Sequence, residues 1–332
     1  MPHCARTITR RDFVRTTAAG MAAAPFANLN HLGRVFAPPR SRVAVVRTAD
    51  RRRGVSQALA LLDLGAVRDK RVVLKPNFNS ADPAPASTHN DTLAQLVTEL
   101  QERGARSITL AESSGPPQTR GVMERKGTFD LARDLRFDVV DFEQLADDDW
   151  VHFVPRGTHW PDGFWLPRLV VGSEYTVSTC CLKTHGAGGV FTMSLKLSVG
   201  LTPKRIRRTM HGSRDIRRMI AELNTGYRPQ LIVLDGVTAF TDGGPSRGEL
   251  KNANVMIAGD DRVAVDAVGL AVLKAIGAND AIMRRRIFDQ EQIARAVELR
   301  LGAAGPDDIE IVTGDAASRS FAGDMRGILA RG

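Results

Sequence analysis

The sequence predicts an α/β fold in which helices cover both faces of a mostly parallel sheet, and three observations support this prediction. Short apolar runs that suit buried strands alternate with segments whose apolar residues recur at helical spacing. Glycines follow several of the helical segments, as they do at helix C-termini. Polar and charged residues stand directly after the apolar runs, where a parallel sheet gathers its ligands.

The first half of the chain shows this alternation most clearly. Its apolar patterns predict a series of strands separated by helices. The strands are expected at residues 42–47, 72–74, 107–111 and 137–142, and the helices at 54–64, 93–103 and 119–135. Thr88, Asn90 or Asp91 is expected to cap the helix at 93–103. This order is typical of a parallel sheet with crossover helices.

The second half begins with a Trp/Pro-rich insertion. Residues 143–173 contain Trp150, Trp160 and Trp165, and we expect short strands whose aromatic rings pack beneath a long loop. Regular patterns then return, around a turn-rich loop at 241–248. Strands are expected at residues 175–182, 231–234, 254–258 and 309–312, helices at 263–276 and 290–301, and a loose tail at 315–332.

The N-terminal segment resembles an export signal. Arg10 and Arg11 are followed by Phe13 and by a small, weakly apolar tract, which is the pattern of a twin-arginine signal. We therefore expect residues 1–37 to be signal and linker, the twin-arginine export machinery to be a partner, and the protein to be periplasmic or secreted. The alternative is an amphipathic N-terminal helix. In either case we expect residues 38–314 to form a single α/β domain.

Composition narrows the function classes. Hydrophobic residues make up 43% of the 332, enough for a large core, and no apolar run approaches the ~20 residues that a membrane span needs. The cysteines are Cys4, Cys180 and Cys181, too few for a four-thiolate cluster, so no iron–sulfur cluster is expected on this chain. Neighbouring cysteines on a strand point to opposite faces, which predicts buried thiols rather than a disulfide.

The stretch from Cys180 to Gly200 carries the strongest signal of a site. An apolar strand runs into a glycine-rich turn that includes Gly188 and Gly189. Residues 191–201 alternate apolar and polar, as a strand does, but the glycines before them and Pro203 after them favour a helix. A strand, a glycine turn and a helix N-terminus would expose backbone N–H groups that suit an anion.

Lysines near this stretch are candidate functional residues. Only eight of the 46 basic residues are lysine, so a lysine at a strand end is informative. Lys75 and Lys183 follow buried strands, and Lys196 shares a face with Thr192 in either conformation. We expect Lys183 and Lys196 to be catalytic and Lys75 and Thr192 to bind substrate. The alternative for a lysine at a sheet rim is a solvated side chain that packs only through its stem.

Histidine and carboxylate residues form a second candidate set. His185 is a candidate general base, metal ligand or hydrogen-bonding orienter. Glu112, Asp235 and His89 would offer the oxygen and nitrogen ligands of a metal site, although their spacing matches no known ligand signature. Asp235 before Gly236 also fits an ordinary turn.

Several alternatives are disfavoured by the sequence. Phe191 stands where a dinucleotide fingerprint needs its third glycine, and no phosphate-binding Gly-Lys-Ser/Thr motif is present. The arginine-rich segment 204–218 lacks interleaved aromatic residues, so we expect no nucleic acid. A solvated helix face, or an attraction for anionic ligands, explains this segment better.

Taken together, these pieces resemble one family. The residues that carry the resemblance are Lys75-Pro76-Asn77, Thr88, Glu112-Ser113, Lys183-Thr184-His185, Thr192, Lys196, Gly200, Gly243-Gly244-Pro245, Gly248 and Val265-Asp266-Ala267. In this order they resemble Domain of Unknown Function 362, a bacterial and archaeal family whose members are sometimes fused to ferredoxin-like iron–sulfur modules. The resemblance spans residues 70–280 and implies a shared site, which would include Asn77 and Ser113, but no established reaction. Because cysteine clusters are missing, the chain resembles an exported, stand-alone form.

Two functional hypotheses follow. In the first, the protein is an enzyme that acts on a small anionic compound: Lys183 and Lys196 hold a carboxylate or phosphate and His185 moves a proton. In the second, it is a non-catalytic binding or redox-accessory protein that carries a metal ion or another cofactor and works with a separate redox partner.

Overall fold

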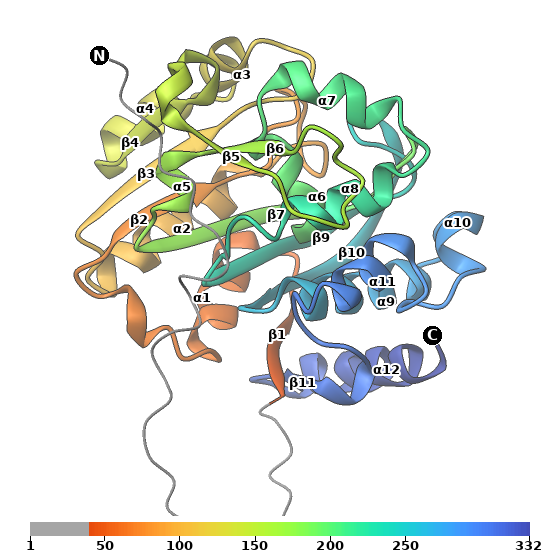
Figure 1. The fold of residues 1–332 in the computed structure, drawn as a ribbon. Helices are drawn as coiled ribbons and strands as arrows, with labels where there is room; N and C mark the ends of the chain where they lie inside the picture. The colour runs from red at the N-terminus through yellow and green to blue at the C-terminus, as the bar shows by residue number, and fades with distance from the viewer. Residues whose placement is uncertain (1–39) are drawn as a thin grey trace, which may run out of the picture. The chain divides into compact units, whose positions relative to one another are not determined.

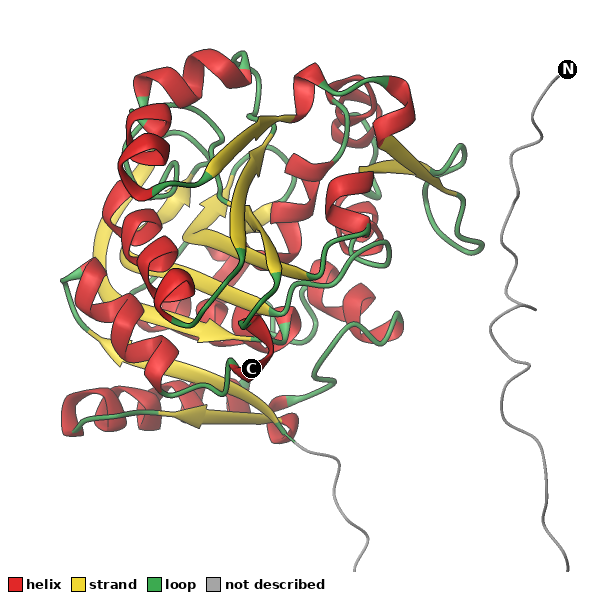
Figure 2. Cartoon of the chain, turned by 90° about the vertical axis from the view of Figure 1, so that its left-hand side faces the viewer, coloured by secondary structure: helices red, strands yellow, loops and turns green. Residues whose placement is uncertain are grey.

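The computed structural model describes residues 40–332 and confirms the α/β fold. Within these residues, strands of a nine-stranded sheet run through the middle of the molecule and helices flank them (Figures 1 and 2). The export signal expected at residues 1–37 lies outside the described residues. No helix in the described part of the chain is both long and apolar enough to span a membrane.

Most strands agree closely in position with the apolar runs of the sequence. The strands are β1 (Ser41–Arg47), β2 (Arg71–Lys75), β3 (Ser107–Glu112), β4 (Asp138–Asp141), β5 (Trp150–Phe153), β6 (Phe164–Pro167), β7 (Tyr175–His185), β8 (Val190–Thr192), β9 (Leu231–Gly243), β10 (Gly248–Gly259) and β11 (Ile309–Val312). Two of them, β9 and β10, extend well beyond the expected 231–234 and 254–258. The turn-rich loop expected at 241–248 is the tip of a long hairpin formed by β9 and β10.

The helices lie between the strands. They are α1 (Arg51–Ala60), α2 (Asn90–Glu102), α3 (Thr119–Arg125), α4 (Thr128–Leu135), α5 (Arg168–Val171), α6 (Ser194–Leu197), α7 (Lys204–His211), α8 (Ile216–Leu223), α9 (Arg262–Ala275), α10 (Asp280–Met283), α11 (Glu291–Glu298) and α12 (Ala316–Arg331). Short 3₁₀ turns add η2 (Gly65–Val67), η3 (Phe142–Gln144), η4 (Asp147–Asp149), η5 (Ser198–Leu201) and η6 (Pro306–Asp308).

The sheet is mostly parallel, as predicted. Its order is β11-β1-β10-β9-β7-β2-β3-β4, and β8 pairs with the end of β7. Only β10 and β8 run against the other strands of this sheet, because β1 and β9 both pair antiparallel with β10, and β8 pairs antiparallel with β7. The carboxyl ends of β2, β3 and β7 therefore lie at one edge, as expected for a ligand site.

Both faces of the sheet are buried. Along β9, Leu231 and Val233 belong to the core cluster beneath α1 and α2, whereas Ile232 and Leu234 belong to the cluster beneath α9. Alternate side chains of a strand point to opposite faces, so this division places helices on each side.

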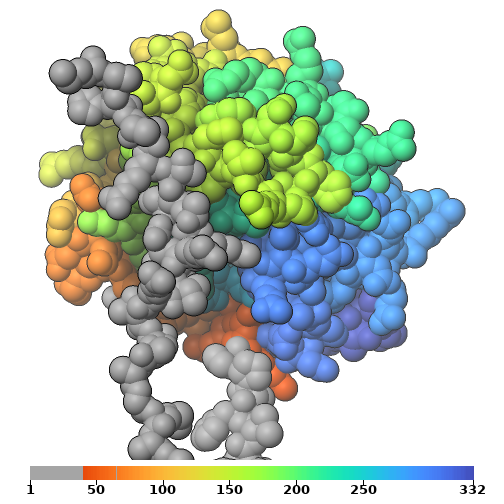
Figure 3. All heavy atoms as spheres, viewed as in Figure 1, coloured from red at the N-terminus to blue at the C-terminus, as the bar shows by residue number. Residues whose placement is uncertain are grey.

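The tryptophan-rich insertion contains short strands, as expected. β5 and β6 form a separate antiparallel pair. Trp150 and Trp160 are buried in a third core cluster, and the indole N–H of Trp160 donates to the Met219 carbonyl at 3.0 Å. In Figure 3 the yellow-green insertion lies beside the green residues that follow position 200. Arg205, from the second of these segments, lies over the Trp165 ring of the insertion.

Two expectations need correction. The helix expected at 119–135 is two helices, because Gly127 between α3 and α4 adopts a left-handed φ of 66° that breaks the helical path. The loose tail expected at 315–332 is helix α12, whose Ala322, Met325 and Leu329 recur at helical spacing and are buried in the core.

The ambiguous segment at 191–201 contains both a strand and a helix. Residues 190–192 form β8, and the chain then turns into α6 and η5. The alternating pattern was therefore correct at the start of the segment, and the helical interpretation was correct after Met193.

Candidate active site

The site lies at the carboxyl edge of β2, β3 and β7. Lys75 ends β2, Glu112 ends β3, and Lys183 and His185 lie in the last three residues of β7. β8 folds back onto β7 so that Thr192 pairs with Lys183. The chain then turns into α6, which carries Lys196.

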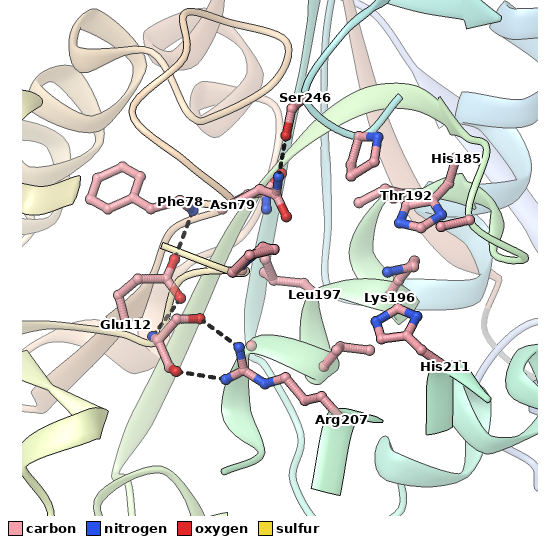
Figure 4. Close-up of a pocket in the computed structure, with 18 of the residues that line it drawn as sticks. Phe78, Asn79, Glu112, His185, Thr192, Lys196, Leu197, Arg207, His211 and Ser246 are labelled. Atoms are coloured by element: carbon pink, nitrogen blue, oxygen red, sulfur yellow. Dashed lines mark hydrogen bonds between the residues drawn. The ribbon is translucent and has the colours of Figure 1, made fainter. Parts of the chain in front are cut away.

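These residues line a cavity of about 580 Å³. Its lining combines basic, polar and apolar side chains from several elements (Figure 4). The lining residues are Lys75, Asn77, Phe78, Asn79, Glu112, Ser113, Gly115, Pro116, Lys183, His185, Ala187, Thr192, Lys196, Leu197, Val199, Gly200, Lys204, Arg207, Arg208, His211, Pro245 and Ser246. Six of them are lysine or arginine and one is acidic, so the cavity favours an anion.

Lys75 and Glu112 form a buried ion pair at one side of the cavity. Lys75 Nζ donates to Glu112 Oε1 and, at 2.7 Å, to the Pro76 carbonyl. The carboxylate also accepts the backbone N–H groups of Phe78 and Ser113, each at 2.7 Å. Glu112 therefore holds together the loops that follow β2 and β3. Gly200 makes room for this pair, since a Cβ there would lie 2.8 Å from Lys75 Nζ.

Arg207 fixes the same side from α7. Its guanidinium donates to Ser113 Oγ at 2.6 Å, to the Ser114 carbonyl at 2.6 Å and to the Thr202 carbonyl. The side chain is buried, and burial lowers its pKa to about 10. Arg207 is therefore still charged at neutral pH, but its donors are largely used by protein acceptors.

Lys183 and Lys196 differ in their partners. Lys183 Nζ donates to the Ala86 carbonyl at 2.6 Å, and burial lowers its pKa to about 8. Lys196 is also buried, but its amine makes no hydrogen bond or ion pair with any residue that the structure describes. Burial, reinforced by the charges of Lys183 and Arg207, lowers the pKa of Lys196 to about 7.

Two histidines flank Lys196. The rings of His185 and His211 are nearly parallel, with centroids 6.5 Å apart, and Figure 4 shows the end of Lys196 between them. Burial, and then the charge of Lys196, lowers the pKa of His185 to about 2 and also lowers that of His211. Both imidazoles are therefore neutral hydrogen-bonding groups in the ligand-free pocket.

Three lining residues carry buried polar atoms without a partner. They are the side-chain oxygens of Asn77 and Thr192 and Nδ1 of His185. A buried polar atom that lacks a hydrogen bond costs about 1–3 kcal/mol. Unpartnered atoms beside a cavity are therefore the groups that a ligand would satisfy.

The structure thus brings together most of the predicted site. Lys75, Asn77, Glu112, Ser113, Lys183, His185, Thr192 and Lys196 all line the one cavity. Glu112 and Ser113 do so mainly as structural partners of Lys75 and Arg207.

The turn at Gly188 and Gly189 does not form the strand–turn–helix arrangement expected of an anion nest. Gly188 and Gly189 do not line the cavity, and the turn that holds them leads into β8 rather than a helix. The Gly188 N–H donates to the Gly186 carbonyl at 3.0 Å, within the turn itself. The helix that follows, α6, has its first N–H groups bonded to the Asp266 carboxylate. Gly189 still matters sterically, because a Cβ there would lie 2.8 Å from Lys196 Cε.

The proposed metal ligands are not brought together. His89 caps α2, where its Nδ1 accepts the Asp91 N–H at 3.1 Å. Asp235 accepts from Arg51 Nε at 2.8 Å and from Thr92 Oγ1 at 2.7 Å, and Glu112 pairs with Lys75. Across residues 40–332, no cluster of three or more His, Cys, Asp or Glu side chains is placed to hold a metal ion.

The sequence interpretation missed the contribution of α7. Lys204, Arg207, Arg208 and His211 line the cavity from this helix. Their spacing of three, four and seven residues puts them on one helical face, which is the signal that would have found them. Asn79 and Ser246, which line the cavity and are joined by a 2.7 Å hydrogen bond, carried no such pattern.

The fold and the cavity define the chain as an α/β protein with a basic pocket at the carboxyl edge of its sheet. More particularly, it belongs to the family called domain of unknown function (DUF362), whose model matches residues 72–271. That range contains every residue that lines the cavity.

The chain is also similar to individual proteins. The chain is 25% identical over 214 residues to the Thylakoid-associated protein sll1697 of Synechocystis sp., a match covering 61% of this chain and 63% of that protein. Its fold is similar, with a TM-score of 0.45 and 13% identity, to the lactate racemase apoprotein from Thermoanaerobacterium thermosaccharolyticum, over 86% of each chain.

Proposed function

We propose that the protein is an enzyme whose basic pocket binds and transforms a small compound carrying a carboxylate or phosphate group. The observation that carries this proposal is Lys196, a buried amine without a counter-charge in a cavity lined by five other lysine or arginine residues. Burial disfavours the ammonium form of such a lysine, and a partner of opposite charge stabilises it. A bound anion would supply that partner.

The lining suggests how the pocket would hold such a compound. Lys196 and Lys183 would neutralise the anion, and the side chains of Asn77 and Thr192 would orient it through hydrogen bonds. Leu197, with Phe78 and the prolines of the lining, gives an apolar wall for a carbon skeleton. An anion near His185 would raise its pKa towards the ordinary range, which would make this imidazole able to take a proton from the substrate.

The test is anion binding by a Lys196→Met variant. Isothermal titration with sulfate, phosphate and small carboxylates should give at least a tenfold weaker affinity than the wild-type protein, about 1.4 kcal/mol. The melting temperature should stay the same or rise, because the variant removes a buried amine that has no partner.

Lys70→Met is the matched control, since it removes the same charge from an exposed position outside the cavity. This control should bind anions as the wild type does. Equal affinity for all three proteins would refute an anion site at Lys196. A large loss of stability in Lys196→Met would instead make Lys196 a structural residue.

We also propose that residues 1–37 direct export by the twin-arginine route. The paired arginines, Phe13 and the small apolar tract support this proposal.

A further inference from the structure

The four lysines of the cavity are not equivalent. Lys75 donates to a carboxylate, Lys183 donates to the Ala86 carbonyl, and Lys204 pairs with Glu143 at 2.6 Å. Lys196 is the one cavity lysine whose amine is bonded to nothing among residues 40–332. The pocket therefore holds three engaged ammonium groups and one free amine.

The surroundings of Lys196 favour its neutral, nucleophilic amine over its ammonium form. Its neighbours His185 and His211 are neutral imidazoles, and the nearby Lys183 and Arg207 are cations that disfavour a further positive charge. Gly189 packs against its stem so closely that a Cβ would lie 2.8 Å from Cε and 3.1 Å from His185 Nδ1. Gly189 thus holds the side chain of Lys196 in the cavity wall, near His185 Nδ1, which has no hydrogen-bond partner.

From this geometry, and building on the anion site proposed above, we propose that Lys196 forms a covalent imine with the carbonyl group of a small oxo acid. The oxo acid offers the two features that the pocket matches: an anionic group for the other cations of the lining, such as Lys183, and an electrophilic carbon for the free amine of Lys196. Asn77 and Thr192 line the same cavity with unpartnered oxygens, and the Thr192 hydroxyl can donate to the oxygen of the substrate carbonyl.

The step balances without any other reactant. The lone pair of Lys196 Nζ attacks the carbonyl carbon, the carbonyl oxygen takes up a proton, and the nitrogen loses one, which gives a carbinolamine. The C–O bond then breaks, the hydroxyl leaves with a proton as water, and the C=N bond forms. No atom is oxidised or reduced.

The protonation state supports the same role. With its pKa lowered to about 7, most of Lys196 is the neutral nucleophile at pH 7.5, whereas only about one in a thousand ordinary exposed lysines is neutral there. A buried lysine next to other cations is a known way to activate an amine for imine chemistry.

Reductive trapping tests this proposal. The protein is incubated at pH 7.5 with pyruvate and sodium cyanoborohydride, digested, and analysed by peptide mass spectrometry. We expect the reduced adduct at Lys196 on the order of several hundredfold above that at exposed Lys70, following the larger neutral fraction. Acetone, which has the same ketone without the carboxylate, should label Lys196 at least about tenfold less than pyruvate.

Lys196→Arg and Lys196→Met are the test variants, and both should lose the adduct while still folding by circular dichroism. Lys70→Arg is the control and should be labelled at Lys196 as the wild type is. An excess of propionate, which has the carboxylate without the ketone, should protect Lys196 from pyruvate.

A parallel titration with propionate, without reductant, separates this inference from the proposed function. If propionate binds but Lys196 reacts no more than Lys70, the imine is refuted and the anion site remains. If neither propionate nor pyruvate binds and no adduct forms at Lys196, both proposals fail. Labelling of Lys183 in place of Lys196 would overturn the assignment of the nucleophile.

Discussion

Lys75 and Lys196 show how one residue type takes different roles according to its partners. Both side chains are buried in the wall of the same cavity. The carboxylate of Glu112 compensates the charge of Lys75, so that this lysine holds the scaffold. Lys196 has no such compensation from the described residues, so burial disfavours its ammonium form and lowers its pKa to about 7. The described residues therefore leave the pocket without a negative charge to balance a protonated Lys196.

The sequence predicted both lysines but could not separate their roles. Each was found by its place after a strand or by the face it shares with Thr192. The pairing of Lys75 with Glu112 joins residues 37 positions apart. It depends on β2 and β3 being neighbours in the sheet, which is a tertiary property that local spacing does not contain.

Anion binding at this site should take up protons. In the free protein the pKa of Lys196 is about 7 and that of Lys183 about 8, both below the ordinary value near 10.5, because of burial. A bound anion favours the ammonium forms and raises both values. Sulfate affinity should therefore be highest below about pH 7 and should fall, by up to about tenfold per pH unit for each lysine, as the pH rises above the free-state values.

Calorimetry in buffers of different ionisation enthalpy measures this uptake directly. At pH 8 the wild-type protein should take up on the order of one proton per sulfate bound. The Lys196→Met variant should take up clearly less at saturating sulfate. A pH-independent affinity without proton uptake would show that the buried lysines do not meet the anion.

At the scale of elements, α6 and α7 complete the site. α7 presents four polar or basic side chains to the cavity from one face, and α6 positions Lys196. The basic character of 204–218 predicted a solvated helix face or an attraction for anionic ligands, but without the bounds of α7 the sequence did not show which side chains face the cavity. The start of α6 was hidden by the strand alternation that continues from β8.

Asp266 in α9 anchors the start of α6. Its carboxylate accepts the backbone N–H groups of Ser194 at 2.7 Å and Leu195 at 2.9 Å, and all three residues are buried. Asp266→Ala would leave two buried donors without a partner, at about 1–3 kcal/mol each. We expect the free energy of unfolding to fall by about 2–6 kcal/mol, as measured by urea denaturation.

This loss should depend on pH. Burial raises the pKa of Asp266 to about 7, so the folded protein holds this proton more tightly than the unfolded chain does. The stabilising contribution of Asp266 is therefore complete below about pH 4 and decreases as the pH rises towards about 7.

The matched control is Asp260→Ala, which removes an exposed carboxylate just before α9 and should change stability by less than about 0.5 kcal/mol. Equal losses for the two variants would argue against the anchor.

At the scale of the whole molecule, the fold class was predictable, but the packing of the C-terminal helix α12 against the core was not. The alternation of strand and helix patterns predicted the sheet, because both periods follow from backbone geometry. The C-terminal segment was misjudged because Gly323 and Gly327 weaken its helical pattern and many of its residues are polar. Its few apolar side chains become significant only because α12 packs against α9 and against β1, a strand from the other end of the described chain (Figure 1).

A substitution at Met325 tests whether the packing of α12 contributes to the stability of the fold. Its side chain is buried in the core cluster beneath α9, so Met325→Ala should lower the free energy of unfolding by about 2–5 kcal/mol. Asp324→Ala is the matched control, since the neighbouring side chain in the same helix is exposed and should change stability by less than about 0.5 kcal/mol. Both variants are measured by urea denaturation monitored by tryptophan fluorescence, because the three tryptophans lie far from α12 in sequence. If α12 were a loosely attached tail, the two variants would give the same midpoint as the wild type, since a mobile helix contributes no burial to the cooperative unit.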